Sequence, residues 1–265
     1  MKVLAESLGA AAAIVIALVA GTVGSVEDER VLLPAVALPL IAMVAGMVWT
    51  VVASREQPFV AVEQASQRPR AETRPRPRDF AWYLASRFAG VAAVSFFVPY
   101  GLYYLRDVAK QPDPVAALGV VGLAAGAMLS IAVVVAGKLS DRVGPRRLVL
   151  VGSVGSAIGV VALLPLHELV LIVVVAGCIG AAAGVLLASN WALALDIVSS
   201  SWPARQLGIV NIVTAGGAAM ARLSGVGIDA LNRQSDGLGY TVALSAVAGL
   251  LFVAGFAITR VRGVG

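Results

Sequence analysis

A few charged side chains in this sequence interrupt long apolar runs, where a charge is costly unless it has a structural or functional role. Arg87 lies about two turns into one such run. If the run crosses a membrane, its side chain can either reach the membrane–water interface or contact a solute. Arg222 and Asp229 are seven residues apart in another run, on roughly the same face of a helix. Their spacing favours a structural ion pair, with a gating or binding contact as the alternative.

Amides and aromatic rings in the same runs could bind a small polar solute. Sugars are commonly held by hydrogen-bonding amides that have aromatic faces beside them. The candidates of this kind are Asn190, Trp191, Asn211, Tyr100, Tyr103 and Tyr104. For the three tyrosines, anchoring at the membrane–water interface is an equally good interpretation.

The sequence offers little for other chemistry. It lacks a cluster of catalytic carboxylates or histidines and a phosphate-binding loop, so we do not expect an enzyme, a metal site or a cofactor. Cys178 is the single cysteine, and it lies in an apolar run. No carboxylate falls in the middle of an apolar run, so a proton-coupling acid is not evident.

The elements that position these residues are predicted to be membrane-spanning helices. The chain has 265 residues, of which 59% are hydrophobic and only 13% are charged. Runs of roughly 18 or more apolar residues can cross a bilayer as a helix. About eight runs qualify, so the predicted fold is an all-α membrane protein. They are Leu8–Val26, Val31–Ala53, Phe80–Leu105, Val115–Gly137, Leu148–Leu166, Leu169–Val198, Leu207–Leu231 and Tyr240–Thr259.

One long break divides the chain into residues 1–53, with two predicted helices, a linker over residues 54–79, and residues 80–265, with six. The linker holds six arginines and four prolines without apolar periodicity, which is typical of a disordered basic loop in the cytoplasm. A nucleic-acid-binding tail is the alternative, but the net charge of +5 is spread over loops, and we expect no nucleic-acid partner. The first run could instead be a secretory signal peptide.

The distribution of lysine and arginine predicts the topology. Loops on one side carry most of the basic residues, whereas the loops on the other side contain only Arg30, Arg106, Lys110 and Arg233. The positive-inside rule then places both termini in the cytoplasm after eight crossings of the plasma membrane. Glycines three or four residues apart also form stripes that permit close helix packing. Such stripes include Gly152, Gly155 and Gly159, and then Gly177, Gly180 and Gly184.

The loop between the fourth and fifth predicted helices carries a recognisable pattern. Its residues are Gly137, Leu139, Asp141, Arg142, Gly144, Arg146 and Arg147. The loop resembles the signature loop of the major facilitator superfamily, which reads Gly-x-Leu-small-Asp-Arg-aromatic-Gly-basic-basic. Val143 and Pro145 depart from that pattern, as is typical of the weaker second copy in the C-terminal half of these transporters.

The resemblance implies that the last six helices form the C-terminal half of a twelve-helix carrier of a small polar solute, built from two three-helix inverted repeats. The stretches Asp79–Asp107 and Asn190–Asp196 look most like the sugar-carrying branches. Four helices of the family are unaccounted for, so we expect an incomplete chain that needs missing N-terminal helices or a second chain. A non-transporting remnant or accessory subunit is the alternative, and a membrane-embedded enzyme is less favoured.

The same repeat places the end of the sixth helix beside the signature loop. We therefore expect Asp196 to pair with Arg142 or Arg146 as a cytoplasmic latch. Asp141 is expected to face the N-terminus of the first helix, whose free amide groups attract an anion.

Overall fold

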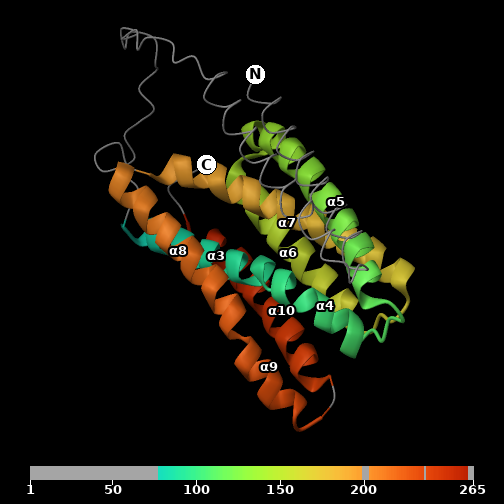
Figure 1. Cartoon of the computed structure of the whole chain (residues 1–265). Coiled ribbons are helices and arrows are strands. Elements are labelled where there is room, and N and C mark those ends of the chain that lie inside the picture. Colours follow the sequence, from blue (N-terminus) through green and yellow to red (C-terminus); the bar gives the residue numbers. More distant parts are fainter. Residues whose placement is uncertain (1–76, 199–202, 236, 262–265) are drawn as a thin grey trace, which may run out of the picture. The chain divides into compact units, whose positions relative to one another are not determined.

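A computed structural model describes residues 77–198, 203–235 and 237–261 (Figure 1). The predicted helices Leu8–Val26 and Val31–Ala53, most of the basic linker and the possible signal peptide lie outside these residues. Every regular element in the described part of the chain is a helix, and the bounds are as follows. They are α3 (Pro77–Ser95), α4 (Phe97–Asp107), α5 (Pro114–Val143), α6 (Pro145–Leu163), α7 (Leu169–Ile197), α8 (Pro203–Leu223), α9 (Gly225–Asn232) and α10 (Leu238–Thr259).

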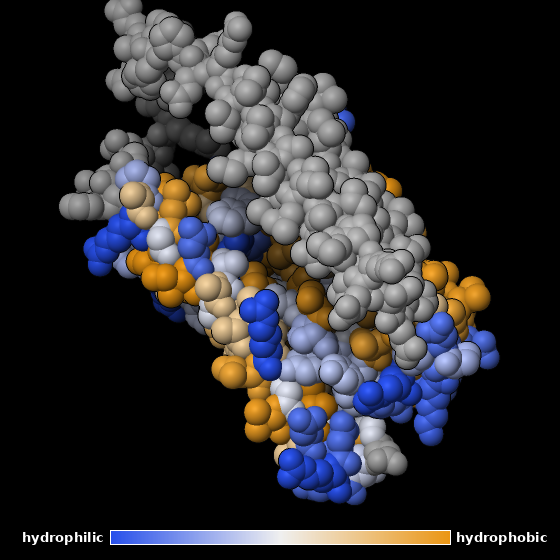
Figure 2. All heavy atoms as spheres, viewed as in Figure 1, coloured by the Kyte–Doolittle hydropathy of each residue, from blue (hydrophilic) through white to orange (hydrophobic). Residues whose placement is uncertain are grey.

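Five of the described spans are long and apolar enough to cross a membrane, and the bent pair α3 and α4 adds a sixth. Figure 2 shows hydrophobic side chains (orange) over much of the visible described surface, with hydrophilic ones (blue) mainly at its lower end and edges. This pattern is the reverse of a soluble surface, because lipid rather than water surrounds the middle of each span. The prediction of an all-α membrane fold is confirmed.

The predicted helix Phe80–Leu105 is interrupted, which corrects the expectation of one continuous span. Its two parts, α3 and α4, meet at an angle of 41°. Pro99 explains the bend, because a proline cannot donate a hydrogen bond to the carbonyl four residues earlier, and its ring clashes with that carbonyl. Here that carbonyl belongs to Ser95, the last residue of α3. The N–H of the next residue, Phe96, donates to the Ala93 carbonyl three residues earlier, at 3.3 Å, instead of to the carbonyl four residues earlier.

The predicted helix Leu207–Leu231 is also divided, at Ser224 between α8 and α9. The backbone bonds continue across the break, because Ser224 N–H donates to the Met220 carbonyl and Ile228 N–H donates to the Ser224 carbonyl. The Ser224 hydroxyl donates to the Ala221 carbonyl at 2.7 Å. A side chain that bonds back onto its own helix in this way often accompanies a local distortion.

Within the unit Pro75–Gly265, neighbouring helices form a chain of contacts. The helix α7 packs on α5 and α6, α6 packs on α10, α10 packs on α3, and α3 packs on α8. Glycines allow the closest approaches, as their stripes predict. A Cβ at Gly180 would collide with the Ala125 carbonyl oxygen of α5, and one at Gly184 would lie 2.5 Å from the Leu129 carbonyl oxygen.

We predict that Gly180→Ala destabilises the unit by about 1–3 kcal/mol, because the added methyl group must push α5 and α7 apart. Gly126→Ala is the matched control, since its Cβ would meet no atom within 4 Å. The measurement is the midpoint of thermal unfolding of both variants in detergent. A midpoint for Gly180→Ala equal to that of the control would show that α5 and α7 do not depend on this contact.

Candidate functional site

The side chain of Arg87 joins three helices inside the bundle. It projects from α3, is only 2% exposed, and donates from Nε to Thr214 Oγ1 of α8 at 2.8 Å. Its Nη1 donates to Asn190 Oδ1 of α7 at 2.9 Å. The guanidinium carbon also lies 4.0 Å from the centre of the Trp191 ring, within the range of a cation–π contact. We call Arg87, Asn190, Trp191 and Thr214 the Arg87 cluster.

Small residues bring the three helices close enough for these bonds. Gly90, one turn after Arg87, packs against Leu186, one turn before Asn190, so α3 and α7 run antiparallel here. On the other side, a Cβ at Gly217 would lie 2.9 Å from the Phe88 carbonyl oxygen. The backbones of α3 and α8 therefore nearly touch, and Thr214 comes within reach of Arg87.

The partners of Arg87 in this cluster are an amide, a hydroxyl and an indole ring, all of them neutral. Hydrogen bonds and the face of an aromatic ring lower the cost of removing a guanidinium from water. They do not balance its charge. An ionisable group held in this way inside a membrane span is a functional candidate by default.

The structure brings together three of the residues singled out from the sequence, Arg87, Asn190 and Trp191. Anchoring of Arg87 at the interface is wrong, because its side chain is buried and bonded inward. Asn211 is exposed on α8, one turn before Thr214. Sequence reasoning missed Thr214. The sequence offered one indication of its role, because Thr214 follows Asn211 by three residues and so lies on the same face of an apolar helix.

The three tyrosine candidates lie on α4, away from the Arg87 cluster. The Tyr100 hydroxyl donates to the Arg222 carbonyl of α8 at 2.6 Å, and the Tyr104 hydroxyl donates to the Leu163 carbonyl of α6 at 2.8 Å. Tyr103 is 43% exposed and stacks on Arg106, whose guanidinium carbon is 5.2 Å from the ring centre. Tyr100 and Tyr104 therefore hold helices together.

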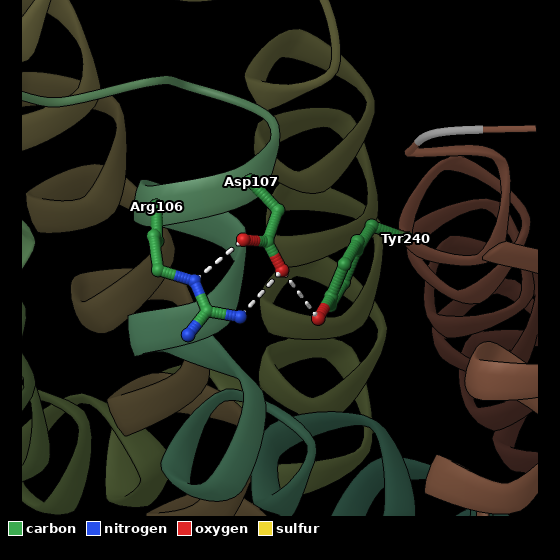
Figure 3. A network of polar contacts seen from close by, with 3 residues as sticks. All are labelled: Arg106, Asp107 and Tyr240. Carbon is green, nitrogen blue, oxygen red and sulfur yellow. Dashed lines mark hydrogen bonds and ion pairs between the residues drawn. The ribbon is translucent and has the colours of Figure 1, made fainter.

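A hydrogen-bond network at the C-terminal end of α4 joins this helix to α10 (Figure 3). Arg106 donates to both carboxylate oxygens of Asp107, at 2.6 and 3.1 Å. The Tyr240 hydroxyl of α10 donates to the same carboxylate at 3.1 Å. Sequence reasoning treated Arg106 as a loop charge and missed this network, because nothing local signals that Tyr240 would lie beside Asp107.

The expected ion pair of Arg222 with Asp229 is not formed. Arg222 is near the end of α8 and Asp229 is in α9, so the break at Ser224 lies between them. The seven-residue spacing that would place them on one face of a continuous helix no longer applies. Both residues are exposed.

The signature loop is shorter than its sequence suggests. The helix α5 continues through Gly137, Leu139, Asp141 and Arg142 to Val143, and α6 begins at Pro145. Only Gly144 separates them, with a φ of 88° that favours glycine. The side chains of Asp141, Arg142 and Arg147 are exposed.

The one member of the motif with an inward bond is Arg146, and its partner was not foreseen. Its Nε donates to the Ile258 carbonyl of α10 at 3.2 Å, and its Nη2 donates to the Thr259 carbonyl. A guanidinium at a helix C-terminus satisfies free carbonyls and favours the negative end of the helix dipole. Asp196 is exposed at the end of α7, and its pairing with Arg142 or Arg146 stays a prediction.

We predict that Thr214→Val destabilises the chain by about 1–2 kcal/mol, because Arg87 loses a buried hydrogen-bond acceptor. Thr241→Val is the matched control. Both threonine hydroxyls donate to the carbonyl four residues earlier, but only Thr214 also accepts a bond from Arg87. Thermal unfolding of both variants in detergent measures the difference. Equal midpoints would show that the Nε bond contributes nothing to stability.

Comparison with known proteins supports what the topology and the signature motif indicate. A search of curated proteins found no match. The family model described as Major Facilitator Superfamily, in contrast, matches residues 3–222, which is most of the chain and includes the whole Arg87 cluster. The chain therefore belongs to the major facilitator superfamily of membrane transporters.

Proposed function

We propose that this chain is a carrier subunit for a small polar solute, sugar-like or drug-like, and that the Arg87 cluster contacts that solute. The observation that carries the proposal is a buried guanidinium on one span that is bonded to neutral partners from two others. Binding sites in this class of carrier are built where spans meet near the middle of the bilayer.

The cluster lies within the spans rather than at their ends. Arg87 is about two turns, or roughly 10 Å along the helix, after the apolar run begins at Phe80. Asn190 and Thr214 meet it at this level. Trp191 is 43% exposed, so part of its side chain lies at the surface of the unit, where a solute could reach it.

Two broken spans flank the cluster. Arg87 lies before the bend between α3 and α4, and Thr214 lies before the break between α8 and α9. Discontinuous helices are common at the substrate sites of secondary transporters, where they free polar groups and allow bending. In our proposal these breaks let one part of the unit move relative to another. Both termini stay on the cytoplasmic side of the plasma membrane.

The proposal predicts saturable binding of a labelled sugar or related polar solute to the purified chain in lipid nanodiscs. Asn190→Ala should weaken this binding by about tenfold, because it removes an amide that can contact solute and that also orients Arg87. Ser245→Ala on α10 is the control, since its hydroxyl is exposed and donates to Thr241 of its own helix. A chain that binds nothing from a broad panel would instead be a non-transporting remnant or accessory subunit.

Alternating access requires two bodies that rock around one site. The described residues form one six-span unit, so we propose that the opposite wall of the cavity comes from other helices or a second chain. A polypeptide of these 265 residues, reconstituted by itself into liposomes, should then fail to accumulate solute. Saturable accumulation that Asp141→Asn abolishes would show that this polypeptide is a working carrier.

A further inference from the structure

Buried hydroxyls without a hydrogen-bond partner occur on the two helices that carry Arg87 and Asn190. In the described residues, four buried side-chain oxygens lack a partner. One belongs to Ser156 of α6, and the other three belong to Tyr83, Ser86 and Ser189. The side chains of Tyr83, Ser86 and Ser189 are at most 1% exposed. An orphaned hydroxyl in an apolar interior is rare, and a group of them calls for a partner that the protein itself does not supply.

Each of these three residues is within one turn of Arg87 or Asn190 along its helix. Tyr83 is one turn before Arg87 on the same helix face, and its hydroxyl lies close enough to interact electrostatically with the guanidinium. Ser189 directly precedes Asn190. Since α3 and α7 run antiparallel with Gly90 beside Leu186, Ser86 and Ser189 fall at the level of the Arg87–Asn190 bond.

The group as a whole is rich in donors and carries one positive charge. A guanidinium has five N–H groups, of which the bonds to Thr214 and Asn190 use two. Each of the three hydroxyls can donate one more bond. An ionised carboxylate is an acceptor with two oxygens and about four lone-pair sites, and it forms short, strong bonds with arginine.

We propose that the solute of this carrier is an organic monoanion and that Arg87 binds its carboxylate, assisted by the hydroxyls of Tyr83, Ser86 and Ser189. This inference rests on the function proposed above and specifies its substrate class. A carboxylate balances the single charge of Arg87. A phosphate monoester, with a charge close to −2 at neutral pH, would leave a negative charge uncompensated in the same place.

Trp191 lies between this site and the surface of the unit. Its ring covers the guanidinium, while its side chain is 43% exposed and Arg87 itself is only 2% exposed. In our proposal the ring moves aside when a carboxylate binds, and an ion pair replaces the cation–π contact. Binding should change the fluorescence of Trp191, which can be isolated by replacing the other three tryptophans with phenylalanine.

The test uses matched probes that differ in charge and little in size. These are D-glucuronate with D-glucose, benzoate with benzamide, and lactate with lactamide, all at constant ionic strength. They are added to the purified chain in nanodiscs, and both the thermal midpoint and the Trp191 fluorescence are recorded. We expect at least one carboxylate to raise the midpoint and change the fluorescence saturably, and its neutral partner to do neither.

Arg87→Gln should weaken the binding of that carboxylate about tenfold or more, since a charge-assisted bond is lost. The control Arg233→Gln removes the same charge from an exposed position in the loop after α9 and should leave binding unchanged. Because Arg87 is buried, its replacement could prevent folding. Ser189→Ala therefore provides a second test, with binding expected to fall several-fold while the charge stays in place.

The outcomes separate the two proposals. Equal binding of a carboxylate and its neutral partner, or a response that survives in both Arg87→Gln and Ser189→Ala, would overturn the monoanion site and leave the chain a carrier of neutral solutes. Saturable binding of glucose 6-phosphate in preference to every carboxylate would overturn the assignment to a monoanion. A chain that binds no probe, charged or neutral, would contradict the solute site as well.

Discussion

Inside a bilayer, a backbone N–H or C=O group without a hydrogen-bond partner costs several kcal/mol, because no water is available to replace the lost bond. This constraint makes each span helical and limits where a span can break. At the bend, Pro99 has no N–H to donate to the Ser95 carbonyl, whereas the division at Ser224 keeps its backbone bonds. Side chains must then hold the helices together, since lipid supplies little hydrophobic drive between them, and the glycine contacts and buried polar bonds do so.

The span made of α3 and α4 is held by different partners on the two sides of its bend. Before the bend, Arg87 binds α7 and α8. After it, Tyr100 binds α8, Tyr104 binds α6, and Asp107 accepts a bond from Tyr240 of α10. A change of angle at Pro99 would therefore reposition the Arg87 cluster relative to the tyrosine contacts, which links the geometry of the site to the shape of the whole unit.

Hydropathy and the signature motif were enough to predict the class of fold, because span length and loop chemistry are local properties of the chain. The breaks in two spans were not predicted, although Pro99 was a visible signal for one of them. For the site, the cost of a buried charge identified Arg87, and polar residues in apolar runs identified Asn190 and Trp191. Thr214, Tyr240 and the carbonyl partners of Arg146 were missed, since their roles depend on which helices become neighbours, and a single sequence does not encode that locally.

The helix α10 is bonded at both ends and more buried than the spans α5 and α8–α9. Arg146 of α6 binds the carbonyls at the end of α10, and Tyr240 at its beginning binds Asp107 of α4, so each end of α10 is bonded to a different span of the unit. The most apolar stretch of α10 is 44% buried, whereas that of α5 is 6% buried and that of the α8–α9 span is 17% buried. Among the five unbent spans of the described residues, α5 and α8–α9 therefore leave the largest share of their apolar stretch unburied. In our proposal, a second body that completes the cavity packs against these two spans, one of which carries Thr214.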